Sequence, residues 1–144
     1  MNGELPPTIH GTAVAIGGRA VLLLGPSGSG KSDLALRLIG SGWTLVADDR
    51  VVLSRRSENL VAAPPPSLAG LIEARGLGFC RMPFLGEAEV ALAVRLVAQG
   101  TVERLPEAAS ETLLGVSIPL IKLISWEASA PTKVHLALGG GVVR

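Results

Sequence analysis

A glycine-rich segment with one lysine and three serines is the part of this sequence best suited to chemistry. It matches the pattern G-x-x-x-x-G-K-S without a gap, after the apolar residues 20–24 and before apolar residues at helical spacing, as a phosphate-binding loop requires. Loop N–H groups and the following helix N-terminus would face phosphate oxygens. The lysine would reach the β- and γ-phosphates, and the last serine hydroxyl would bind Mg²⁺. We predict a nucleoside triphosphate site, rather than a plain Gly/Ser turn, at Gly25, Pro26, Ser27, Gly28, Ser29, Gly30, Lys31 and Ser32.

Two adjacent carboxylates, Asp48 and Asp49, follow the apolar residues 45–47. Adjacent strand residues point to opposite faces, so the two carboxylates should have different roles. One could face the phosphate loop and take a proton from an incoming hydroxyl group, while the other binds the metal or its water. The alternative is a turn signal at a strand end. The residues themselves do not say which carboxylate has which role.

A third segment, Glu73-Ala74-Arg75-Gly76-Leu77-Gly78, combines a carboxylate, a guanidinium group and two glycines. It could join Mg²⁺ ligation to phosphate contact and a close approach of the backbone. Taken alone, an exposed Glu/Arg pair beside a glycine turn is the preferred interpretation, and the glycines indicate unusual backbone angles.

Length and composition predict one compact α/β domain of 144 residues, 1–144, that needs no disulfide or metal for its core. A formal charge of +1 and 3% aromatic residues argue against a nucleic-acid partner. One cysteine and two histidines exclude a disulfide framework and disfavour an all-protein zinc site. Because no apolar run approaches the roughly 18 residues of a spanning helix, we expect a soluble, cytoplasmic protein with no membrane partner.

Apolar periodicity and glycine positions predict short elements, with more hairpins than a doubly wound sheet would have. Gly17-Gly18 indicates a primed turn between strands at residues 9–16 and 19–24. Trp43 and Trp126 are assigned to packing, and no residue is assigned to a nucleotide base. Further strands are expected at 44–47, 51–53, 89–97 and 102–105, helices at 32–39 and 132–138, one helical turn at 67–73, an ambiguous segment at 113–124 and a disordered tail at 139–144.

The three segments GPSGSGKS, LVADDRV and EARGLG together resemble the catalytic domain of bacterial HPr kinase/phosphorylase. Their order and spacing agree with that family from about His10 to Arg81, and His10-Gly11 matches a pair that opens the family's catalytic domain. The resemblance implies a phosphate-loop α/β fold like that of phosphoenolpyruvate carboxykinase.

It also implies an enzyme that uses ATP and Mg²⁺ to phosphorylate a serine of HPr, a carrier protein of the sugar phosphotransferase system. Many members reverse the reaction with inorganic phosphate and release pyrophosphate. By this resemblance Asp48 is the catalytic base, His10 lies near Asp48, and Asp49 supports metal and substrate. Ser32 and Glu73 ligate Mg²⁺, and Arg75 holds its loop near the phosphates.

The sequence departs from the family's pattern at three places, one of which, Asp33 where a glutamate is common, keeps the charge. Full-length members have an additional N-terminal domain, so we expect the short form with only the catalytic domain, and homo-oligomeric assembly is left open. The family's C-terminal Arg-Asn pair is replaced by a stretch containing Lys133, which offers a point charge without a bidentate fork. Two rival functions stay open: a small-molecule kinase with the same loop, and a regulatory ATP-binding module.

Overall fold

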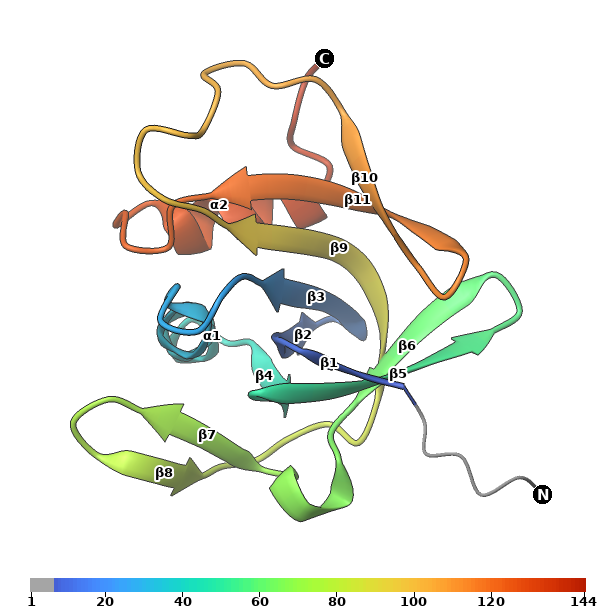
Figure 1. The fold of residues 1–144 in the computed structure, drawn as a ribbon, viewed down its shortest axis with the longest axis vertical. Coiled ribbons are helices and arrows are strands. Elements are labelled where there is room, and N and C mark those ends of the chain that lie inside the picture. Colours follow the sequence, from blue (N-terminus) through green and yellow to red (C-terminus); the bar gives the residue numbers. More distant parts are fainter. Residues whose placement is uncertain (1–6) are drawn as a thin grey trace.

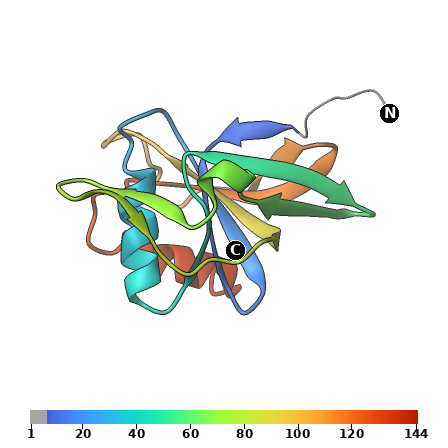
Figure 2. The same cartoon turned by 90° about the horizontal axis from the view of Figure 1, so that it is seen from below.

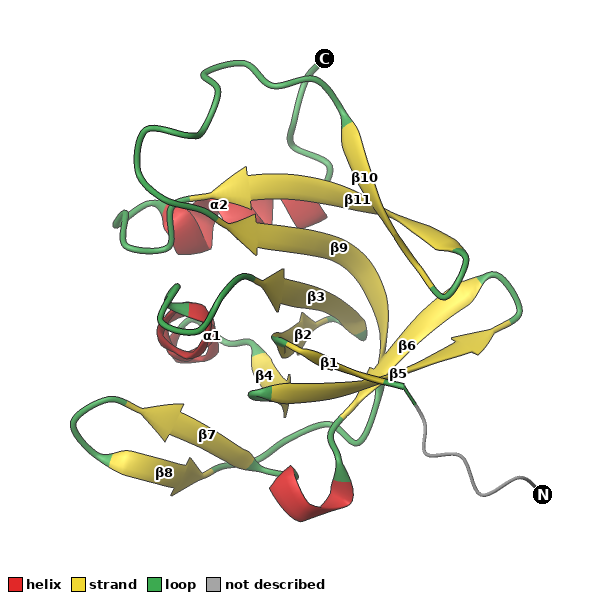
Figure 3. Ribbon diagram, in the orientation of Figure 1, coloured by secondary structure: helices red, strands yellow, loops and turns green. Residues whose placement is uncertain are grey.

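The computed structural model describes residues 7–144, which form an α/β domain with many more strands than helices (Figures 1 and 3). The helices are α1 (Lys31–Gly40) and α2 (Ala130–Leu138), with one 3₁₀ turn, η1 (Pro66–Leu68). The strands are β1 (Thr8–His10), β2 (Thr12–Ile16), β3 (Arg19–Leu24), β4 (Thr44–Ala47), β5 (Arg50–Arg56), β6 (Asn59–Ala63), β7 (Leu71–Ala74), β8 (Gly78–Arg81), β9 (Ala88–Leu96), β10 (Ala109–Leu113) and β11 (Val116–Leu123).

Nine of these strands form one curled sheet organised around the long strand β9. The main path runs β1-β5-β6-β9-β3-β2-β4, while β11 also pairs with β9 and carries β10 at its outer side. Strand β9 is parallel to β3 and to β11, and the remaining pairs are antiparallel. Strands β7 and β8 form a separate two-stranded ribbon. Figure 1 shows that β9 is bent; it pairs with β6 near its start, with β3 along most of its length and with β11 toward its end.

The order of the strands brings three chain segments to one edge of the sheet. Strand β2 lies between β3 and β4 and is antiparallel to both, so β3 and β4 run in the same direction. Thr12 pairs with Leu23, and Ala13 pairs with Ala47. The first residue of β2 therefore meets the carboxyl ends of β3 and β4, where the phosphate loop and the paired aspartates begin.

Both helices cover the same face of the sheet (Figure 2). Alternation along β3 sends Val21 and Leu23 to this face, where they join Leu34 and Leu38 of α1 and Val134 of α2 in one buried cluster. The buried Trp43 belongs to the same cluster, so its predicted packing role is confirmed. Alpha-helix α1 is thereby fixed with its N-terminus at the end of β3.

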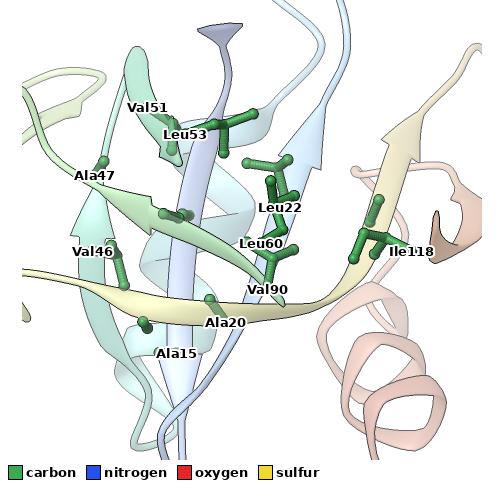
Figure 4. Packing of buried hydrophobic residues seen from close by; sticks show 14 of the residues in the cluster. Ala15, Ala20, Leu22, Val46, Ala47, Val51, Leu53, Leu60, Val90 and Ile118 are labelled. Carbon is green, nitrogen blue, oxygen red and sulfur yellow. The ribbon is translucent and has the colours of Figure 1, made fainter. Parts of the chain in front are cut away.

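The opposite face of the sheet folds onto itself and buries a second apolar cluster (Figure 4). Leu22 of β3 packs there with Leu53 of β5, Leu60 of β6, Val90 of β9 and Ile118 of β11. Small side chains of β2 and β3 leave room for these larger ones, which explains how a core with few aromatics is filled. The strand before the phosphate loop, β3, is therefore buried on both faces from Ala20 to Leu24.

The predicted elements are confirmed in most places and wrong in three. The Gly17-Gly18 turn is confirmed, with both residues at positive φ (58° and 79°), whereas residues 8–10 leave the hairpin as β1 and pair with β5. The helical turn at 67–73 is wrong because only η1 is helical and β7 follows. The strand at 102–105 is also wrong, because this segment is an exposed loop.

The ambiguous residues 113–124 contain the whole of β11, and the predicted C-terminal helix is α2 with its proline in the first turn. Residues 139–144 contain no helix or strand, and their disorder stays a prediction. Among residues 7–144, neither helix has the length and apolar character needed to span a bilayer.

Candidate active site

The phosphate loop connects β3 to α1, as its sequence context predicts. Lys31 is the first residue of the helix, and its Nζ donates hydrogen bonds to the carbonyl oxygens of Gly25 (2.7 Å) and Pro26 (3.0 Å). The side chain thus folds back over its own loop. Burial lowers the pKa of the Lys31 ammonium group, and the nearby charges of Asp48 and Asp49 oppose this effect.

All three glycines of the loop, Gly25, Gly28 and Gly30, have a positive φ. Gly30 has a φ of 94° at the position that caps α1, and Gly25 has a φ of 151°. A Cβ atom added at Gly25 would lie 2.7 Å from the Ser29 hydroxyl oxygen. Within residues 7–144 no side chain caps the N-terminus of α1, so the first N–H groups of the helix are available to an anion.

Asp48 is buried beside the start of α1 and is 5% exposed. Its Oδ1 accepts hydrogen bonds from the hydroxyl groups of Thr12 (2.8 Å) and Ser32 (2.7 Å), and its Oδ2 accepts one from the backbone N–H of Glu73 (2.9 Å). The carboxylate therefore joins the start of β2, the start of α1 and the strand β7. Sequence reasoning did not identify Thr12, because it is 36 residues from Asp48 and becomes its neighbour only through the strand order.

Asp49 has the opposite environment, with a side chain that is 66% exposed. Its backbone has a φ of 69°, a left-handed conformation that turns the chain between β4 and β5. The His10 Nε2 lies 3.3 Å from the Asp49 Oδ1, whereas the resemblance placed this histidine near Asp48. The two carboxylates do point into different environments, as expected for adjacent residues.

A single pocket joins Lys31, Ser32 and Asp49 with the third segment, whereas Asp48 lies behind Thr12 and Ser32 and is not among the lining residues. Glu73 belongs to β7, and Arg75 begins the turn between β7 and β8, where Gly76 has a φ of 93° and Gly78 a φ of 101°. The unusual backbone angles predicted for these glycines are confirmed. The pocket is lined by His10, Thr12, Ser27, Gly28, Gly30, Lys31, Ser32, Asp33, Leu36, Asp49, Glu73, Arg75 and Trp126. Sequence segments that are far apart thus surround one phosphate loop.

The comparisons with known proteins agree with this geometry. The profile of the HPr Serine kinase C-terminal domain family matches residues 5–128. The chain belongs to this HPr kinase domain family. HPr kinase/phosphorylase from Bordetella avium is 38% identical over 128 residues, covering 81% of this chain and 42% of that protein. The homologue from Shouchella clausii is 48% identical over 81 residues, covering 54% of this chain and 26% of that protein.

A solved structure supports the same relationship. The Hpr(Ser) kinase/phosphatase from Coxiella burnetii matches this HPr kinase domain with a TM-score of 0.83 and 26% identity, covering 94% of this chain and 90% of that chain. The α/β fold predicted from the sequence resemblance is confirmed. The chain spans about two fifths of the length of the full HPr kinase/phosphorylases from Bordetella.

The polar groups of this HPr kinase domain fit a magnesium ion that is held jointly with phosphates. Within residues 7–144 no cluster of three or more His, Cys, Asp or Glu side chains could hold a metal by itself. Mg²⁺ commonly takes only one or two protein ligands and completes its shell with water and substrate phosphates. Ser32 and Glu73 line the same pocket, and Asp48 holds the Ser32 hydroxyl at the loop. These residues suit a site in which the protein and the phosphates both coordinate Mg²⁺, rather than one formed by protein ligands alone.

Trp126 lies at an edge of the pocket. It is 60% exposed and lines the pocket beside the loop, so it is not a core residue, and its ring lies close to Gly30, in line with packing at an edge. The sequence alone does not show this position, because residues 124–129, between β11 and α2, are brought to the phosphate loop by the tertiary structure. Lys133 of α2 is paired with Glu127 of this segment at 3.0 Å.

Proposed function

We propose that this domain is an ATP- and Mg²⁺-dependent kinase that phosphorylates a serine of an HPr-type phosphocarrier protein in the regulation of carbohydrate metabolism. The observation that supports it best is the buried Asp48 carboxylate, which is held against Ser32 of the phosphate loop. Membership in the HPr kinase family supports the choice of acceptor. The reaction would take place in the cytoplasm, where nucleotide and carrier protein meet.

Asp48 has the hydrogen bonding that a general base needs. An ionised carboxylate offers about four lone-pair sites, and the structure uses two on Oδ1 and one on Oδ2. One acceptor site on Oδ2 is therefore left for the hydroxyl group of a substrate serine. The serine oxygen would attack the γ-phosphorus while its proton passes to Asp48, and ADP would leave.

The phosphate loop supplies the charge that this transfer requires. The loop amides and the N-terminus of α1 would hold the phosphates, and Lys31 would exchange its bonds to Gly25 and Pro26 for phosphate oxygens. Ser32 and Glu73 would hold Mg²⁺, and Asp49 and Arg75 would contact metal and phosphates from the rim. When bound, the metal neutralises charge on the phosphoryl group that is transferred.

The open rim of the site favours a protein acceptor over a small molecule. His10, Asp49, Glu73 and Arg75 are all exposed around the pocket. The turn that contains Arg75 also presents Leu77, which is 81% exposed, and Phe79 follows in β8 at 75%. A small-molecule kinase needs a concave acceptor pocket, whereas these side chains offer a surface on which a folded protein can rest.

The same residues support the reverse reaction by phosphorolysis. An oxygen of inorganic phosphate would attack the phosphorus of phosphoserine, and the departing serine oxygen would take a proton from protonated Asp48. The products would be HPr and pyrophosphate. The names of the curated relatives include this phosphorylase activity.

Intact-mass spectrometry of HPr after incubation with the domain, ATP and Mg²⁺ tests the proposal. We expect a gain of one phosphoryl group, located on a serine by fragmentation, that requires Mg²⁺ and is reversed when phosphate is added without ATP. A chelator supplies the matched control. If HPr keeps its mass while ATP binds, the acceptor is wrong, and a small-molecule kinase or a regulatory nucleotide-binding module takes its place.

A further inference from the structure

A second pocket lies on the other side of the phosphate loop and shares part of its wall with the first. It is lined by residues 26–29 of the loop, residues 96–99 after β9, Ile124, Trp126 and Glu127. Ser27, Gly28 and Trp126 line both pockets. A ligand with its phosphates in the first pocket can therefore continue past the loop into the second.

The segment that carries Trp126, between β11 and α2, is hydrogen-bonded both to the phosphate loop and to α1. The Ser125 hydroxyl donates a hydrogen bond of 2.5 Å to the carbonyl oxygen of Ser29, and Arg37 of α1 donates to the carbonyl oxygens of Ser125 and Glu127. The Trp126 backbone is thus flanked by two anchored residues. Its exposed indole ring is presented on a fixed support rather than on a loose loop.

The indole ring itself lies against the phosphate loop. A Cβ atom added at Gly30 would be 3.0 Å from the Cη2 atom of Trp126. The glycine therefore provides the space in which the edge of the indole sits, in addition to the backbone conformation described above. Because 60% of Trp126 is exposed, this position leaves much of the ring free for another planar group.

The chemistry of the second pocket suits an uncharged planar group rather than another phosphate. Leu96, Val97 and Ile124 give it apolar walls, and none of its lining residues is a lysine or arginine. Its one charged side chain is the carboxylate of Glu127, which pairs with Lys133 at 3.0 Å. Gln99 adds an amide that can both donate and accept hydrogen bonds.

We propose that this second pocket is the nucleoside subsite, in which the base stacks on Trp126 and lies against residues 96–99 and Ile124. The proposal rests on the nucleotide dependence proposed above and deepens it by assigning the part of ATP that the phosphate loop does not hold. Stacking on an indole ring tolerates different bases, so Gln99 is the residue placed to discriminate between them.

Calorimetric titration of Trp126→Ala with MgATP and with inorganic triphosphate separates the contribution of the base to binding from that of the phosphates. The Kd for MgATP is expected to rise about tenfold, within the range that loss of base–aromatic stacking produces, while the Kd for triphosphate stays unchanged. Trp126→Phe retains a ring and should recover most of the affinity. Leu105→Ala removes another exposed apolar side chain, 77% exposed and outside both pockets, and should change neither Kd.

Two outcomes would overturn the subsite. An unchanged Kd for MgATP in Trp126→Ala would show that the base lies elsewhere. An equal loss of MgATP and triphosphate affinity would show that Trp126 merely shapes the loop. Failure of the proposed function is distinguishable, because wild-type protein would then bind neither probe, or would bind MgATP through Trp126 without modifying HPr.

The fluorescence of the two tryptophans gives an independent readout. Trp43 is 4% exposed in the core, whereas Trp126 is exposed beside the loop. MgATP should quench the wild-type emission and should leave that of Trp126→Phe, which retains only Trp43, almost unchanged. Quenching that persists in Trp126→Phe, or equal quenching of wild type by triphosphate, would contradict stacking.

Discussion

Two sides of the site, one centred on Asp48 and the other on Asp49, differ more than their adjacency in sequence suggests. Asp48 is buried and accepts three hydrogen bonds from three different chain segments. Asp49 is largely exposed, and its partner is the partly exposed His10, whose Nε2 lies 3.3 Å from the Asp49 Oδ1. We call the first the buried wall (Thr12, Ser32 and Asp48) and the second the exposed rim (His10, Asp49, Glu73 and Arg75).

The difference indicates how the two regions would contribute to the proposed phosphoryl transfer. Groups of the buried wall are oriented by the fold before any ligand arrives, so in that reaction they would act without reorganisation. The exposed rim consists of solvated side chains that can adjust to an acceptor protein. Mutations in the wall should therefore affect both chemistry and stability, whereas those in the rim should affect the binding of metal, phosphates and acceptor more than stability.

Asp48→Asn should produce the largest effect on catalysis. The amide cannot take a proton from serine, and we expect transfer to fall by about 10²–10⁴-fold, the usual contribution of a general base. MgATP affinity should change little, because the loop and Lys31 are intact. Rates of HPr phosphorylation with calorimetric nucleotide binding measure both quantities. If Asp48→Asn kept the full rate of transfer and Asp49→Asn lost it, the general base would be Asp49 of the exposed rim.

Thr12→Val should have the next largest effect, a loss of stability that comes from the loss of one buried hydrogen bond. Valine conserves the shape of the buried threonine and removes the donor to the Asp48 carboxylate. We expect the free energy of unfolding to fall by about 1.5–3 kcal/mol, as for other hydrogen bonds to charged groups. Thr12→Ser keeps the hydroxyl and should cost less, roughly 1 kcal/mol for one methyl group. Urea titration of both variants tests this; a larger loss in the serine variant would contradict it.

The affinity for MgATP should fall as the pH rises into the alkaline range. Burial lowers the pKa of the Lys31 ammonium group in the free domain, and bound phosphates favour its charged form, so binding takes up a proton above that lowered pKa. The loss should begin at lower pH than for an ordinary lysine. Lys31→Arg keeps its charge throughout, and its affinity should stay flat across this range. An equally flat profile in the wild-type domain would contradict the prediction.

Asp49→Asn should have the smallest effect on stability. The exposed pair with His10 contributes at most about 1 kcal/mol, and asparagine tolerates the positive φ of this position. Asp49→Ala should be less stable than Asp49→Asn, because the Cβ atom of alanine is strained in the left-handed backbone conformation of this position. Thermal unfolding of the three proteins measures the order. An asparagine variant less stable than the alanine variant would show that the charge matters more than the backbone.

Much of the site was predictable because its parts are short and contiguous. The phosphate loop, the strand before it and the helix after it follow from consecutive residues, and the structure places them as expected. The Gly17-Gly18 turn and the proline at the start of α2 are local signals of the same kind. The segment 102–105 shows the limit: a short apolar run predicts a strand only if a partner strand lies beside it, and none does among the described residues.

By itself the sequence determined the chemistry available to this protein: a phosphate loop, two adjacent carboxylates and a Glu/Arg segment, each readable from neighbouring residues. The tertiary structure alone decided that Asp48 is buried, that Asp49 pairs with His10, and that Thr12 and Trp126 belong to the site. The reason is that these contacts depend on which strands lie side by side, and strand order is set by the burial of apolar faces over the whole chain rather than by any local pattern.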